Sequence, residues 1–139
     1  METETAADPL DQFARLLQLV EHLRGPDGCP WDRRQTPISL QKYLLEETSE
    51  LIEAIDQAQS SEICDEIGDV LFILTLLIAI HREQQQFSAD EVFARIMAKM
   101  IRRHPHVFGG APVSDEDELR AQWQRIKALE KQSPPPSLP

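Results

Sequence analysis

The sequence predicts an all-α protein with a four-helix-bundle type of core and one additional C-terminal helix. Three observations favour this fold class. Apolar residues recur at helical spacing along most of the chain, and no segment shows a sustained β-strand period. The 139 residues include only 5 glycines and 6% aromatic residues, which disfavours a β-sandwich or barrel rich in tight turns. With 41% hydrophobic and 27% charged residues, a chain of this length is expected to form one domain with a buried core.

Five helices are expected, at residues 8–24, 38–58, 60–82, 88–103 and 114–131. Gly25-Pro26 stops the first helix, and residues 25–37 contain so many prolines and glycines that a loop is expected there. Ser60 or Ser61 is the expected cap of the third helix. His104-Pro105 ends the fourth helix, and residues 108–112 (FGGAP) are expected to form a second loop.

Serines with an acidic residue three positions later mark two more helix starts. Ser88 with Glu91 has the spacing of a capping box, and Ser114 with Asp117 opens the last helix in the same way.

The two ends of the chain are expected to lie outside the folded domain, which the sequence places at residues 8–132. Residues 1–7 are expected to be flexible, and residues 133–139 (SPPPSLP) to be a disordered tail. The first ten residues are acidic and lack an apolar core, which argues against a signal or transit peptide. Cys29 and Cys64 fit neither a disulfide framework nor a zinc motif. These features predict a soluble cytoplasmic protein.

The negative charge is concentrated in one part of the sequence. The net charge is -10, which argues against a general nucleic-acid-binding surface. Residues 43–81 contain nine carboxylates and no lysine or arginine, whereas residues 92–114 contain four basic residues and no acid. A charge run of this kind is often only a solvated helix face. The positions of individual carboxylates favour a more specific interpretation.

Two carboxylate pairs have the spacing of one helix face. Glu47 and Glu50 are three residues apart in an EExxE pattern, and Glu66 and Asp69 are three apart in an ExxD pattern. A short linker predicts that their helices form an antiparallel hairpin, which would bring the pairs to one level. Neither helix offers a basic partner one turn away. Four converging carboxylates, with no His or Cys at coordinating spacing in this block, predict a site for Mg²⁺, or for Mn²⁺ in its place.

The basic segment supplies a second half for such a site. Lys99 and Arg103 are four residues apart on the fourth helix, and Arg102 is adjacent. These side chains could neutralise phosphate oxygens of a substrate bound to the metal. The alternative is that they only complement the dipole at a helix C-terminus. On the first interpretation, Arg103→Ala would weaken substrate binding without changing the melting temperature.

Residues 70–80 (VLFILTLLIAI) are apolar except for Thr75. The segment is too short to span a membrane, and a helix that is apolar all round must be covered on every side. Because so small a domain cannot easily enclose it, a partner chain is expected. The sequence therefore predicts a homodimer or a higher oligomer.

The EExxE and ExxD patterns resemble those of the all-α nucleoside triphosphate pyrophosphohydrolases. Further segments narrow the resemblance to the MazG family: residues 28–32 (GCPWD), 43–47 (YLLEE), 102–109 (RRHPHVFG) and 123–127 (WQRIK). The resemblance covers roughly residues 10–131. Longer members of that family carry two such domains in tandem, whereas this sequence holds one.

The resemblance implies Mg²⁺-dependent hydrolysis of a nucleoside triphosphate to the monophosphate and pyrophosphate by a helical bundle that dimerises. Carried over by motif position, it implies that Glu47, Glu50, Glu66 and Asp69 bind the metal. Glu46 becomes the candidate to orient or deprotonate the attacking water or to hold a second ion.

Substrate contacts are also implied by the resemblance. Lys99 and Arg103 would clamp the triphosphate, and Trp123 and Lys127 would lie near the nucleotide. Trp31 would either stack on the base or anchor its own loop. His104 and His106 are expected to shape the turn around Pro105.

Two rival functions are distinguishable. A ferritin-like di-iron oxidoreductase needs Glu-x-x-His pairs, and no His follows Glu47 or Glu66 at that spacing. A non-catalytic nucleotide or metal sensor would keep the carboxylates without turnover.

Overall fold

The computed structural model describes residues 7–134 and 136–138, and every regular element in this part of the chain is a helix. The expected flexible segment 1–7 therefore lies outside the described residues except for Ala7, and the tail at 133–139 is described only in part. The chain forms two compact units, residues 1–85 and 86–139.

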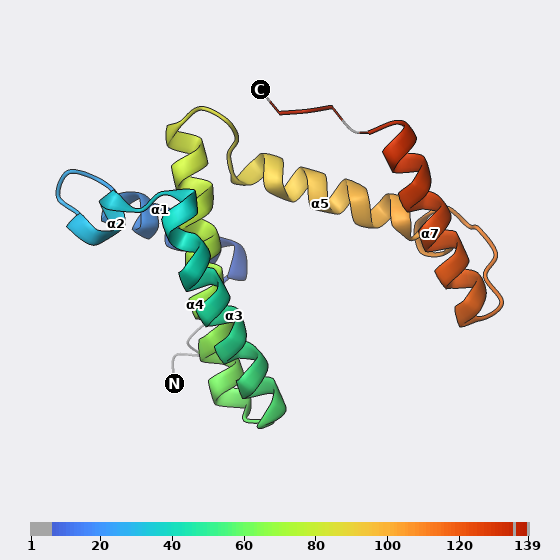
Figure 1. The fold of residues 1–139 in the computed structure, drawn as a ribbon, viewed down its shortest axis with the longest axis horizontal. Helices are drawn as coiled ribbons and strands as arrows, with labels where there is room; N and C mark the ends of the chain where they lie inside the picture. Colours follow the sequence, from blue (N-terminus) through green and yellow to red (C-terminus); the bar gives the residue numbers. More distant parts are fainter. Residues whose placement is uncertain (1–6, 135, 139) are drawn as a thin grey trace, which may run out of the picture. The chain divides into compact units, whose positions relative to one another are not determined.

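The first unit is built on three long helices and one short helix (Figure 1): α1 (Pro9–Leu23), α2 (Pro30–Arg34), α3 (Pro37–Asp56) and α4 (Ser60–Glu83). As the sequence predicts, α3 and α4 form an antiparallel hairpin, and they make the most extensive helix contact in the described chain. Ala58 closes α3 in the left-handed conformation, with a φ of 54°.

The core of this unit lies between α1, α3 and α4. Val20, Leu40 and Leu76 are completely buried, and Ile73 and Ile80 pack with them. Large apolar side chains on three different helices thus exclude water together, which holds the α3–α4 hairpin against α1.

Within residues 70–80, a single chain buries more of the apolar side chains than the sequence predicts. Ile73, Thr75, Leu76, Ala79 and Ile80 are buried within the first unit, whereas Leu74 is 41% exposed. Thr75 satisfies its hydroxyl by donating a hydrogen bond of 2.8 Å to the backbone oxygen of Phe72.

The second unit contains α5 (Ala89–Arg103), the short α6 (Pro105–Phe108) and α7 (Glu116–Gln132). α5 has no buried residue, although Phe93, Ile96, Met97 and Ile101 share its apolar side. α5 contacts α6 and α7 within the unit. The four-helix core and the oligomer stay predictions.

All five predicted helices are present with ends within two residues of those expected, but four local predictions are wrong. Residues 25–37 are not entirely loop, because Pro30 occupies the first turn of α2, a position that its missing N–H tolerates. A short helix that the sequence did not predict also follows His104, again with proline first. It includes Phe108, so only residues 109–112 of the expected second loop are non-helical. Gln59, and not Ser60 or Ser61, precedes α4, so neither serine caps that helix.

The fourth correction concerns the capping boxes. Ser88 precedes α5 but makes no capping hydrogen bond, and Glu91 forms an ion pair with Arg95 at 3.0 Å instead. At α7 the cap is Asp115, whose side chain accepts from the Glu118 N–H at 2.8 Å. A complete capping box that the sequence did not indicate joins Thr36 and Ser39 at the start of α3.

None of the helices in residues 7–134 has the length and hydropathy that a membrane crossing requires.

Candidate metal and nucleotide site

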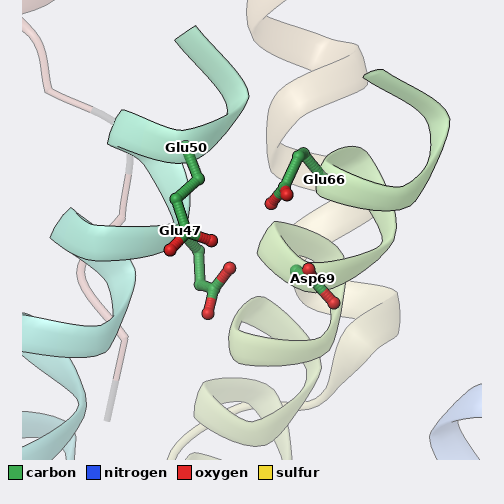
Figure 2. A group of neighbouring side chains, drawn as sticks. All are labelled: Glu47, Glu50, Glu66 and Asp69. Atoms are coloured by element: carbon green, nitrogen blue, oxygen red, sulfur yellow. The ribbon is translucent and has the colours of Figure 1, made fainter. Parts of the chain in front are cut away.

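Four carboxylates converge where α3 and α4 pack together. Glu47 and Glu50 project from α3 toward Glu66 and Asp69 on α4, as Figure 2 shows. One oxygen from each of the four side chains lies within 4.8 Å of the others. The convergence follows from the two three-residue spacings and the antiparallel hairpin, because each spacing places a pair on one helix face.

The carboxylates of Glu47 and Glu66 lie in an energetically unfavourable environment. Glu47 Oε2 and Glu66 Oε2 are inaccessible to solvent and have no hydrogen-bond partner among the described residues. None of the four carboxylates takes part in an ion pair within the described part of the chain. A buried carboxylate oxygen without a partner is costly in a folded protein.

The protonation equilibria reflect the same environment. Burial raises the pKa of Glu47 above its ordinary value of 4.5, and the charges of Glu50 and Asp69 raise it further. Burial likewise raises the pKa of Glu66, followed by the charges of Glu50 and Asp69. Either protons or a cation would relieve the repulsion in this cluster.

The donor set fits a hard divalent cation. All ligand atoms are carboxylate oxygens from α3 and α4, which suits Mg²⁺ or Mn²⁺ better than zinc or copper. The two orphaned oxygens are the atoms that such an ion would satisfy. Glu46 is exposed and is not one of the four clustered carboxylates.

The cluster predicts how the stability of the metal-free protein depends on pH. A glutamate in the unfolded chain has a pKa of 4.5, whereas the pKa values of Glu47 and Glu66 in the folded state are higher. At pH values between these limits, the folded state binds more protons than the unfolded state. The free energy of unfolding therefore falls as the pH rises through this interval. Denaturant unfolding with EDTA at several pH values measures this slope. Glu66→Gln should flatten it, and a parent protein that gains stability across the interval would contradict the prediction.

A buried arginine holds the loop before α3 in place. The side chain of Arg24 is only 8% exposed, and it binds Glu83 at the end of α4 with two hydrogen bonds of 2.9 Å. Its Nη1 also donates to the backbone oxygens of Asp32 at 2.6 Å and Gln35 at 3.2 Å. This arginine therefore joins α1, α2 and α4.

Trp31 packs inside the same unit. Its ring meets Tyr43 edge-on at 5.2 Å between centroids, and Gln35 donates a hydrogen bond to its backbone oxygen. Because Tyr43 packs on the core, this contact favours the anchoring role of Trp31 over base stacking.

In the second unit, both predicted arginines contact one carboxylate. Arg102 Nε donates to Glu130 Oε1 at 2.7 Å, and Arg103 Nη2 donates to Glu130 Oε2 at 2.8 Å. Substitution of Arg103 by alanine would remove two of the hydrogen bonds that Glu130 accepts and leave the bond from Arg102. Because these contacts stabilise the folded state, we expect Arg103→Ala to lower the melting temperature, in contrast to the prediction from the sequence.

The other predicted nucleotide contacts are also in this unit. The Arg103 guanidinium lies 5.3 Å from the centre of the Trp123 ring, and the His104 ring meets Trp123 edge-on at 5.3 Å between centroids. Lys127 is half-buried one turn after Trp123, and Lys99 is exposed. His104 and His106 flank Pro105 at the start of α6, and Gln122 bonds to the His106 ring at 3.1 Å, consistent with a role in shaping this turn.

Comparisons with known proteins agree with the sequence patterns. Residues 35–108 match the MazG nucleotide pyrophosphohydrolase domain. The chain is 45% identical over 119 residues to a nucleoside triphosphate pyrophosphohydrolase/pyrophosphatase MazG of Thermotoga maritima, covering 86% of this chain and 45% of that protein. It is 37% identical over 123 residues to a nucleoside triphosphate pyrophosphohydrolase of Escherichia coli K12, covering 88% and 47%.

A solved structure shows the same fold. The crystal structure of a mazG-related protein from Thermotoga maritima matches with a TM-score of 0.68 and 26% identity, covering 83% of this chain and 98% of that one. The chain spans about half or less of the length of the curated relatives that it matches.

An all-helical fold with two carboxylate pairs on one helical hairpin defines the class of the all-α pyrophosphohydrolases. The chain belongs to the MazG nucleotide pyrophosphohydrolase family.

Proposed function

We propose that the protein hydrolyses nucleoside triphosphates to nucleoside monophosphate and pyrophosphate, using a divalent cation held by Glu47, Glu50, Glu66 and Asp69. The observation that carries the proposal is the pair of buried, unpartnered oxygens of Glu47 and Glu66. Mg²⁺ is the expected ion and Mn²⁺ a substitute, because every donor in the cluster is a carboxylate oxygen. The activity of the named relatives supports this substrate class.

The four metal-binding carboxylates and Glu46 would have different roles in the reaction. When bound, the cation would neutralise phosphate charge and make a water molecule more acidic. Glu46 is exposed on the same helix turn as Glu47, so it is free to orient or deprotonate that water. Glu47 and Glu50 would hold the ion from α3, while Glu66 and Asp69 would hold it from α4.

Basic and aromatic groups of the second unit would bind the nucleotide. Lys99, Arg102 and Arg103 would contact the triphosphate, which stabilises the charge that moves onto pyrophosphate as it leaves. Trp123 and Lys127 would lie near the nucleotide. Trp31, packed edge-on against Tyr43, would anchor its own loop in the first unit and would not stack on the base.

Product analysis tests the activity and separates it from a sensor role. With a panel of ribo-, deoxy- and modified nucleoside triphosphates, the parent protein should release monophosphate and pyrophosphate in equal amounts. Release of diphosphate and inorganic phosphate would contradict the proposed reaction. Saturable nucleotide binding without any product would identify a non-catalytic sensor. A cytoplasmic role in maintaining the nucleotide pool is the setting that we propose for the activity.

We also propose that the active form is a homodimer or a higher oligomer. Ile38, Leu45 and Ile52 are exposed at seven-residue intervals along α3, and Leu74 is exposed on α4. Such spacing places the three α3 residues on one stripe. A stripe of this kind is typical of a helix that packs against a partner.

Leu74→Glu tests the oligomer. Because Leu74 is 41% exposed in the single chain, we expect the variant to stay folded and to lose the oligomeric mass in light scattering. Leu76→Glu is the contrasting variant, because Leu76 is completely buried and a charge there should unfold the first unit. A parent protein that is monomeric at micromolar concentration would contradict the prediction.

A further inference from the structure

Glu130 on α7 binds both arginines at the end of α5. Its Oε1 accepts from Arg102 Nε at 2.7 Å and from Arg103 Nε at 3.3 Å, and its Oε2 accepts from Arg103 Nη2 at 2.8 Å. The Glu130 and Arg103 side chains are only 15% and 17% exposed, whereas Arg102 is 41% exposed. Because one carboxylate pairs with two guanidinium groups, the cluster of Glu130, Arg102 and Arg103 has a net positive charge.

Trp123 fixes Arg103 from another direction. It precedes Glu130 by seven residues, which places both side chains on one face of α7. The Arg103 guanidinium lies 5.3 Å from the centre of the Trp123 ring, within the range of a cation–π contact. Arg103 is thus held by the Glu130 carboxylate at its Nε and Nη2 and by the Trp123 ring over which its guanidinium lies, so that little side-chain freedom remains.

The contacts with Glu130 leave donors available. They use Nε of Arg102 and the Nε and Nη2 of Arg103, so the other guanidinium nitrogens can still donate to an anion. Arg102 and Glu130 also line an open groove of about 350 Å³, so a ligand can reach this part of the surface. Hydrogen bonds from Arg103 and Arg102 lower the pKa of Glu130 to about 2, so the carboxylate stays charged at neutral pH.

We infer that Glu130 is a positioning residue for the phosphate chain of the substrate: it holds Arg102 and Arg103 together, with free donors directed at a polyphosphate. The inference rests on the proposed function only in that the polyphosphate is taken to be that of a nucleoside triphosphate. Neither arginine would need to reorganise on binding, and preorganised donors bind an anion more tightly than mobile ones.

Binding of inorganic tripolyphosphate tests the inference by calorimetry. EDTA is included so that the carboxylate cluster does not contribute through a metal. We expect Glu130→Gln to raise the Kd roughly tenfold, comparable to the loss of one charge-assisted hydrogen bond. Glu116→Gln is the matched control, because Glu116 is also on α7 but is 90% exposed and lies 4.0 Å from its only ion partner in the described chain, Arg120. It should bind as the parent does.

Three other results of this binding experiment would overturn the inference. An unchanged Kd with a lower melting temperature would overturn the inference and leave Glu130 a purely structural residue. A lower Kd would also overturn it, because Glu130 would then compete with phosphate for the arginines. Should Glu130→Gln not fold, Glu130→Asp keeps the charge but shortens the side chain, and an unchanged Kd in that variant would overturn the inference.

Kinetics separate this inference from the proposed function. In the pyrophosphate assay with Mg²⁺, Glu130→Gln should raise KM by a factor similar to the change in Kd and change kcat much less. A parent protein whose tripolyphosphate binding depends on Glu130 but that releases no pyrophosphate would contradict the proposed function alone. An active parent whose KM does not respond to Glu130→Gln would contradict the inference alone.

Discussion

Replacing Glu50 by glutamine is expected to abolish most turnover and to leave the metal-free protein at least as stable as the parent. Glutamine keeps the shape of the side chain but removes one negative charge from a cluster whose oxygens lie within 4.8 Å of one another. Glu50 also helps to raise the pKa values of Glu47 and Glu66, so its charge acts against the folded apoprotein. A salt-bridge role would predict the opposite, with activity kept and stability lost.

The measurement combines a pyrophosphate-release assay with melting curves in EDTA and in Mg²⁺. Turnover should fall by more than about 100-fold, because substitution of residues that only orient the metal ligands already costs about 10–100-fold. Mg²⁺ should raise the melting temperature of the parent by binding the folded state, and should raise that of the variant less. Asp69→Asn should behave in the same way from the opposite helix.

Glu53→Gln is the matched control for these variants. Glu53 is exposed on α3, three residues after Glu50, and lies outside the cluster. The control should keep parental turnover and the parental response to Mg²⁺. Near-normal turnover in Glu50→Gln would refute the assignment of the cluster as a metal site.

Arg24→Ala is expected to cost about 2–4 kcal/mol of the free energy of unfolding. The substitution removes two hydrogen bonds to Glu83 and leaves the backbone oxygens of Asp32 and Gln35 without this donor. Because Glu83 is 49% exposed, water replaces part of the lost ion pair, and the carbonyl oxygens account for much of the cost.

The neighbouring ion pair between Arg82 and Glu21 provides the comparison. Both side chains are well exposed, at 60% and 45%, so Arg82→Ala should cost less than about 1 kcal/mol. Urea unfolding monitored by circular dichroism measures both variants. Equal costs for the two substitutions would show that Arg24 does not join α1, α2 and α4 in the way described.

The helices and the acidic site were predictable from the sequence because each depends on the spacing of residues within one or two short segments. Three-residue spacing at Glu47 and Glu50, and again at Glu66 and Asp69, sufficed to place four carboxylates together once the connection was known to be short. Capping was less predictable. Asp115 displaced Ser114 at α7, and Ser88 makes no cap, because several adjacent polar residues compete for the same N–H groups.

The contacts between distant segments could not be read from the sequence. Glu130 is 27 residues from Arg103, and Arg24 is 59 residues from Glu83. No local period links such positions, and charged side chains of this kind are usually exposed. The seven-residue spacing of Trp123 and Glu130 was a usable signal, because it placed an acid on the face of the helix that carries the proposed nucleotide contact.

The central claim is that the carboxylate cluster binds a divalent cation on which hydrolysis depends. The most direct test is pyrophosphate release by the parent protein after exhaustive treatment with EDTA, followed by titration with Mg²⁺ and, separately, with Mn²⁺. We predict no release before metal is added and saturable recovery with either ion. Turnover that is the same with and without metal would contradict the claim.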